Sequence, residues 1–157
     1  MLSKVQLDKF WEDGFVLVEN GATVDQLSEL SSQLDEWIDQ SKSHDKNYGN
    51  TPDGKARFDL EAGHSADKPR LRRVANPADI SDSYYEVLIK GVIPDMVVDL
   101  IGPDVKFHHC KLNIKLPGMQ TKVDFHQDHP YDPHTNDDMV TALLMLDEMT
   151  EANGCPL

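Results

Sequence analysis

Residues 105–116 alternate between two kinds of side chain, as expected for a β-strand with one buried face. One face carries His108, Cys110, Leu112, Ile114 and Leu116. The other carries Phe107, His109, Lys111, Asn113 and Lys115. Pro117-Gly118 then predicts a turn. The fold therefore contains a sheet that is apolar on one side and polar on the other.

The N-terminal part of the chain predicts helices. Ser3 caps a first helix that Gly14 ends. Thr23 and Gln26 form the capping box of a second helix. The apolar face of this second helix consists of Val24, Leu27, Leu30, Leu34, Trp37 and Ile38. Residues 15–18 predict a short buried strand, and residues 41–69 lack periodicity and predict a long loop.

Helices continue after this loop, and strands follow them. A helical region begins at Asn76-Pro77, and Pro94 and Gly102 frame a short helix over residues 95–101. In the helical region that follows Asn76-Pro77, the predicted buried face consists of Tyr84, Tyr85, Leu88 and Ile89. Residues 123–126 and 139–147 predict strands, and residues 151–154 a turn.

Helices followed by closely spaced antiparallel strands indicate an α+β fold, with the strands forming a double-stranded β-helix, the jelly-roll or cupin-like barrel. A length of 157 residues fits one domain, with a mainly helical part at 1–103 and the first jelly-roll strands at 104–157. Nothing follows to pair with the last predicted strand, and complete domains avoid an open apolar edge. We therefore expect the barrel to be incomplete and the chain to be a fragment.

The charge balance limits the possible partners. The chain has 28 acidic and 15 basic residues, a formal net charge of −13. This charge disfavours binding to nucleic acid and to anionic membranes. The longest uncharged apolar run, residues 141–146, is too short to span a bilayer, and no secretory signal opens the chain. We expect a cytoplasmic protein, whose oligomeric state the sequence leaves open.

Two minor features have ordinary explanations. A basic cluster at residues 68–73 could meet an anionic cofactor or substrate, although a charged loop beside a helix accounts for it more simply. The two cysteines, Cys110 and Cys155, lack the spacing of a zinc knuckle and do not indicate a disulfide scaffold. We expect both thiols to be reduced.

The segment 124–134 concentrates three of the seven histidines among several carboxylates. Side chains two residues apart on a strand point the same way, so His126 and Asp128 can present a nitrogen and an oxygen to one ion. This pair supplies two members of the two-histidine, one-carboxylate set that binds iron(II) in oxygenases. His-x-Asp alone occurs often by chance, and a solvated polar loop or a zinc site using His129 or His134 remains an alternative.

Four segments occur together in order. They are residues 13–16 (DGFV), 111–118 (KLNIKLPG), 126–128 (HQD), and Asp147 followed by 153–157 (NGCPL). From about Leu7 to the end, the chain resembles the phytanoyl-CoA dioxygenase family of Fe(II)- and 2-oxoglutarate-dependent oxygenases. The resemblance is weakest over residues 41–69.

The resemblance implies roles for four residues. His126 and Asp128 match the family's first iron-binding histidine and its carboxylate. Asn113 and Thr141 match positions that contact 2-oxoglutarate, although hydrogen-bonded strand residues would account for them equally well. The family's second histidine and its arginine for 2-oxoglutarate lie beyond Leu157, so the 157 residues alone should be inactive.

The resemblance also implies a reaction, in which Fe(II), 2-oxoglutarate and O2 hydroxylate a small organic substrate that the sequence does not identify. No other catalytic residue is predicted beyond the metal ligands. Two alternatives remain, a non-catalytic jelly-roll module that binds a ligand and a zinc protein using residues 126–134. A nucleotide enzyme is disfavoured because the glycine-rich phosphate-binding motifs are absent from the sequence.

Overall fold

The computed structural model describes residues 1–119, 126–128, 134–136 and 138–153. Its α-helices are α1 (Lys4–Asp13), α2 (Val24–Ser41), α3 (Asp82–Ile89) and α4 (Val92–Ile101). Its strands are β1 (Tyr48–Asn50), β2 (Ala56–Leu60), β3 (Leu71–Ala75) and β4 (Lys111–Asn113). Two 3-10 turns, η1 (Pro77–Asp79) and η2 (Glu151–Asn153), complete the described elements. None of these helices is long and apolar enough to cross a bilayer.

Local hydrogen bonds start the first two helices where the sequence predicts. Thr23 Oγ1 accepts from the Gln26 amide at 3.2 Å, and Gln26 Oε1 accepts from the Thr23 amide at 2.8 Å. Ser3 and Gln6 form the same capping box before α1, and Gly14 ends that helix with φ of 80°. All three signals act within one helical turn, so distant residues do not disturb them.

The expected strand at 15–18 is wrong. Phe15 and Leu17 are 64% and 84% exposed, and residues 15–18 connect α1 to α2 without pairing to any strand that the structure describes. Val24, expected on the buried face of α2, is also exposed because it lies in the first turn, beyond the edge of the core. An apolar run forms a strand only where another strand can accept its backbone hydrogen bonds.

The four strands form one antiparallel sheet in the order β1-β2-β3-β4. Two of these strands lie within residues 41–69, so the expected long loop is wrong. Residues 56–60 alternate as Ala, Arg, Phe, Asp and Leu, and β3 pairs with them through Phe58↔Val74 and Asp59↔Arg73. Three of the four described strands therefore precede residue 103, in a part of the chain expected to be mainly helical.

The alternation that predicts a strand over 105–116 is confirmed only near its end. Leu112, Ile114 and Leu116 are inward, and Lys111, Asn113 and Lys115 are exposed. Only Lys111–Asn113 is strand, because β3, its partner, ends at Ala75. The turn at Pro117-Gly118 is confirmed by a hydrogen bond from the Met119 amide to the Leu116 carbonyl at 3.1 Å.

The helices between β3 and β4 follow their predicted signals closely. Asn76-Pro77 opens the 3-10 turn η1 before α3, and Gly102 ends α4 as expected, although α4 begins at Val92. Tyr84 is buried as predicted, whereas its neighbour Tyr85 is exposed.

The expected strand at 139–147 is wrong, since the structure shows no regular element there. Leu144 and Leu146 still pack against the core, and Leu143 is exposed. The expected strand at 123–126 and Cys155 lie largely or wholly outside the described residues, although His126 itself is described and is not in a strand.

The core lies between α2, α3 and the apolar face of the sheet. Its buried members are Leu30, Trp37, Phe58, Leu71, Val74, Tyr84, Val87 and Ile114. Trp37 lies between Phe58 and Tyr84, with ring centroids 6.0 and 5.2 Å away. Tyr84 Oη also donates to the Leu30 carbonyl of α2 at 3.1 Å, which ties the two helices together.

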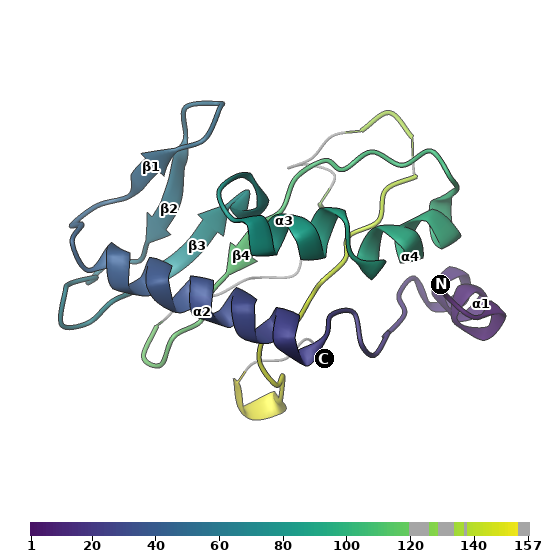
Figure 1. Ribbon diagram of the computed structural model, residues 1–157, viewed down its shortest axis with the longest axis horizontal. Helices are drawn as coiled ribbons and strands as arrows, with labels where there is room; N and C mark the ends of the chain where they lie inside the picture. The colour runs from purple at the N-terminus through teal and green to yellow at the C-terminus, as the bar shows by residue number, and fades with distance from the viewer. Residues whose placement is uncertain (120–125, 129–133, 137, 154–157) are drawn as a thin grey trace.

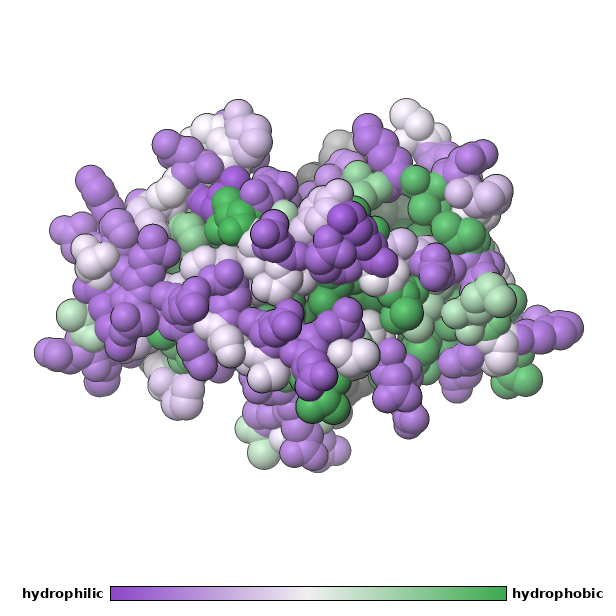
Figure 2. All heavy atoms as spheres, viewed as in Figure 1, coloured by the Kyte–Doolittle hydropathy of each residue, from purple (hydrophilic) through white to green (hydrophobic). Residues whose placement is uncertain are grey.

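These elements make two layers, helices on one side and the sheet on the other. α2 crosses the sheet, and α1 lies at the opposite end of the molecule from β1 (Figure 1). On the face of the molecule shown in Figure 2, hydrophobic side chains are more frequent toward the end that holds α4. The mixed helix and antiparallel sheet confirm the α+β class, and the described sheet is open rather than closed into a barrel.

Candidate functional site

Polar residues of three adjacent strands line up on the face of the sheet that points away from the core. Asn113 pairs with Arg73 across β4 and β3, and Arg73 pairs with Asp59 across β3 and β2. Directly paired residues of antiparallel strands project from the same face. Asn113, which the sequence suggests for the co-substrate, therefore lies beside an arginine and a carboxylate.

A β-bulge adds a second arginine to this row. The pairing runs from Asp59↔Arg73 to Leu60↔Leu71, so Arg72 is an extra residue on β3. A bulge turns two successive side chains toward one residue of the partner strand. Both Arg72 and Arg73 bind Asp59 Oδ2, the latter at 2.9 Å. The basic cluster is thus partly strand, and the expectation of a charged loop beside a helix is wrong for its last residues.

The two guanidinium groups explain why Asp59 can be buried. Asp59 is only 6% exposed, and a buried carboxylate is stable when charged hydrogen-bond donors surround it. The side chains of Arg72 and Arg73 are 40% and 46% exposed, so each keeps part of its surface open to solvent. Two positive charges share one negative charge, and the row carries a net positive charge.

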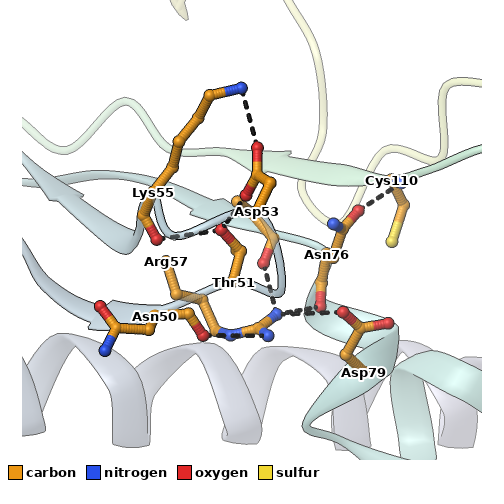
Figure 3. Close-up of polar contacts among 9 residues, drawn as sticks. Asn50, Thr51, Asp53, Lys55, Arg57, Asn76, Asp79 and Cys110 are labelled. Atoms are coloured by element: carbon orange, nitrogen blue, oxygen red, sulfur yellow. Dashed lines mark hydrogen bonds and ion pairs between the residues drawn. The ribbon is translucent and has the colours of Figure 1, made fainter.

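Arg57 occupies the same face of β2 and has a different set of partners (Figure 3). Its Nη1 donates to the Ala75 and Asn76 carbonyls, both at 2.9 Å, and lies 3.4 Å from Asp79 Oδ2. Backbone carbonyls take most of its donors. Arg57 therefore joins β2 to the end of β3 and to η1, which is a structural role.

Asn76 links this network to the approach to β4 (Figure 3). It has φ of 47°, and its side-chain oxygen accepts from the Cys110 amide at 3.2 Å. Burial raises the pKa of the Cys110 thiol. The thiol therefore stays protonated near neutral pH, as a packing group rather than a nucleophile.

The predicted metal ligands lie side by side. His126 Nε2 is 3.3 Å from Asp128 Oδ1, and both side chains are exposed to solvent over more than a third of their surface. An imidazole nitrogen and a carboxylate oxygen this close and this accessible fit two positions of an iron(II) site. Among the residues that the structure describes, no group of three or more metal-binding side chains forms.

The other predicted residues lie in different settings. Asn113 is exposed on β4, in the row with Arg73. Thr141 is exposed in the irregular segment after residue 138. For the zinc alternative, His134 is half-buried, and His129 lies outside the described residues.

The family model for phytanoyl-CoA dioxygenase (PhyH) matches residues 10–157, nearly the whole chain. The chain belongs to the phytanoyl-CoA dioxygenase family. One relative is the probable alpha-ketoglutarate-dependent hypophosphite dioxygenase of Stutzerimonas stutzeri, 38% identical over 84 residues. That alignment covers 54% of this chain and 29% of the relative. No solved structure matches the chain significantly.

Asp59 is not among the residues that the sequence singles out, whereas the two arginines that bind it, Arg72 and Arg73, belong to the basic cluster at residues 68–73. Residues 56–60 lie in the stretch where the resemblance is weakest, within the long loop that the sequence predicts. Their strict alternation of apolar and charged side chains was the available signal for a strand. The bulge at Arg72 has no such signal, since it depends on how β2 and β3 pair.

Proposed function

We propose that this chain is part of an Fe(II)- and 2-oxoglutarate-dependent dioxygenase that hydroxylates a small molecule. The family match supports the reaction class. The observation that carries the site is the adjacency of His126 and Asp128, at 3.3 Å. In a protein that completes the site, these two side chains hold iron(II), and a second histidine completes the ligand set.

Iron(II) held by these residues would activate O2, with 2-oxoglutarate, oxidised to succinate and CO2, as the source of electrons; one oxygen atom would go to the substrate and one to succinate. The protein residues bind and orient. His126 coordinates through a neutral ring nitrogen, and Asp128 coordinates as a carboxylate. Neither residue transfers a proton in this scheme.

Asn113 and Thr141 are the proposed contacts of 2-oxoglutarate. The sheet supports this placement for Asn113, which stands on the charged face away from the helices. In the complete jelly roll that we propose, this face is the interior wall of the barrel. A second sheet would then cover the row of Asn113, Arg73 and Asp59.

The name of the Stutzerimonas stutzeri relative gives hypophosphite as the compound it oxidises. Hypophosphite therefore belongs among the first candidates, together with small organic acids.

The test measures metal binding and turnover separately. We expect the chain to bind cobalt(II), a spectroscopic substitute for iron(II), and His126→Ala or Asp128→Ala to weaken that binding at least tenfold. His108→Ala, which removes an exposed histidine elsewhere, is the matched control. In the whole protein, succinate formation from 2-oxoglutarate should need iron and should be lost in His126→Ala.

The same variants discriminate the zinc alternative. Tight zinc binding that survives Asp128→Ala and is lost in His129→Ala or His134→Ala would contradict the iron site. Normal metal binding with no succinate formation in the whole protein would instead favour a non-catalytic jelly-roll module.

A further inference from the structure

A surface groove of about 660 Å³ lies beside the first turn of α3. After α4 the chain turns back along α3 toward β4, which brings Phe107 next to η1 and α3 (Figure 1). Clefts of about 300–1,000 Å³ are the usual size of sites that bind small molecules. Of the four residues proposed to bind iron or 2-oxoglutarate, all of them described in the structure, none lines this groove.

Large apolar side chains are exposed along the groove. Ile80, Tyr85 and Phe107 line it, and each of the three is exposed. Tyr85 and Ile89 lie four residues apart and therefore share one face of α3. The sequence predicts this face to be buried, but the core covers Tyr84 and leaves Tyr85 outside. Apolar surface that the core leaves uncovered, and that lies in a groove, indicates a ligand with an apolar group.

The groove is negatively charged. Asp79 and Asp82 line it, and none of the lining residues that the structure describes is basic. Asp82 is exposed in the first turn of α3 and forms no ion pair within the described part of the chain. Asp79 Oδ2 lies 3.4 Å from Nη1 of Arg57, a buried guanidinium that also binds two backbone carbonyls (Figure 3). The groove therefore attracts cations and repels anions.

One of the aromatic rings in the groove already contacts a cation of the protein itself. Lys90 Nζ lies 5.1 Å from the centroid of the Tyr85 ring, and Glu86 balances its charge at 2.8 Å. Ammonium groups are attracted to the faces of aromatic rings. Tyr85 and Phe107 thus supply two rings beside two carboxylates, a combination that suits a substituted ammonium group.

We propose that this groove binds a small organic ammonium compound that carries an apolar group. The ammonium group lies beside Asp79 and Asp82, and the apolar group covers Tyr85, Ile89 and Phe107. A neutral molecule of the same shape gains only the apolar contact, and both carboxylates repel an anion. Binding here does not depend on the proposed iron site, so either site can be present without the other.

The experiment is an NMR titration of the isotope-labelled chain at low ionic strength, observing the backbone amides of residues 78–82 and the ring protons of Tyr85 and Phe107. The probes are phenethylammonium, the uncharged phenylacetamide and the anion phenylacetate. We expect saturable shifts with phenethylammonium, about fivefold weaker binding of phenylacetamide, and no binding of phenylacetate. Added sodium chloride should weaken the binding of phenethylammonium, because salt screens exposed charges.

Each variant has a matched control. Asp82→Asn should weaken phenethylammonium binding about threefold. Asp25→Asn removes the same charge from the first turn of α2 and should leave the affinity unchanged. Phe107→Ala should also weaken binding about threefold, because one ring is lost. Phe15→Ala removes another exposed ring, outside the groove, and should have no effect. Circular dichroism establishes that each variant is folded before it is titrated.

Several results would overturn the proposal. One is the absence of a saturable shift with phenethylammonium, and another is equal affinity for phenylacetamide, which would mean that charge plays no part. Equal losses in Asp82→Asn and Asp25→Asn would show a general attraction of cations to an acidic chain. Shifts of the same residues that grow with protein concentration, without any probe, would show that a second copy of the chain covers the groove instead.

Discussion

Two tyrosines of the core differ in whether their hydroxyl groups have a partner. Tyr84 Oη donates to the Leu30 carbonyl at 3.1 Å. The buried Tyr48 hydroxyl has no hydrogen-bond partner within the part of the chain that the structure describes, and its ring stacks on Phe58 at 4.6 Å.

Substitution by phenylalanine should therefore have different effects on the free energy of unfolding at these two positions. Tyr84→Phe should lower the free energy of unfolding by about 1 kcal/mol, because the Leu30 carbonyl loses its side-chain donor. Tyr48→Phe should leave it unchanged or raise it by up to about 1 kcal/mol, because no hydrogen bond is lost. Urea unfolding followed by circular dichroism measures both. A larger loss in Tyr48→Phe than in Tyr84→Phe would contradict the assignment.

Tyr48 also predicts the response to alkaline pH. Burial raises the pKa of Tyr48 to about 12, and an unfolded tyrosine titrates near 10. Between these values the unfolded state loses the proton first, so the free energy of unfolding should fall as pH rises from about 10 to about 12. Below about pH 10, Tyr48 should contribute no pH dependence.

Burial likewise raises the pKa of Tyr84, so this residue adds to the same alkaline loss of stability. Urea unfolding across this pH range should show a shallower decline in Tyr48→Phe than in the parent chain. Identical declines would show that Tyr48 titrates normally in the folded protein.

At the scale of elements, the two capping boxes begin α1 and α2, and these two helices differ in how many of their side chains are buried. α2 buries Leu30 and Trp37 in the core, whereas α1 has no buried residue. A cap stabilises the whole molecule only when its helix unfolds together with the core.

Thr23→Ala should therefore lower the free energy of global unfolding by about 1 kcal/mol, the usual contribution of an N-cap. Ser3→Ala removes the same kind of cap from α1 and should change global unfolding far less. Denaturant midpoints of the two variants provide the comparison. Equal losses would mean that α1 is as firmly docked as α2.

For the whole molecule, the contrast between exposed α1 and buried α2 predicts that local stability differs along the chain. Val5 and Trp11 of α1 are exposed, and a hydrogen bond from the Leu2 amide to Asp99 Oδ2 at 2.5 Å connects this end to α4. Native-state hydrogen exchange should show amides of α1 exchanging by local opening. Amides of β2, β3 and α2 should exchange only through global unfolding. Uniform protection across all four would contradict this.

Features that depend on near neighbours could be predicted from the sequence. The two capping boxes and the Gly14 helix end involve contacts within one turn, and the structure confirms them. The alternation of residues 110–116 correctly divides buried from exposed side chains. His126 and Asp128 lie side by side with one residue between them, although His126 is not in the strand that the prediction assumed.

Features that depend on pairing between distant segments could not be predicted from the sequence. The strands of residues 41–69 and the failure of the strands at 15–18 and 139–147 were decided by which segments found a partner. Only the pairing of β2 with β3 creates the bulge that brings Arg72 and Arg73 to Asp59, 13 and 14 residues away. Local patterns determined the helix ends and the faces of the strands, because they are set by neighbouring atoms. Tertiary structure alone decided the charged row beside Asn113, because a one-residue change of register would move its side chains to the other face.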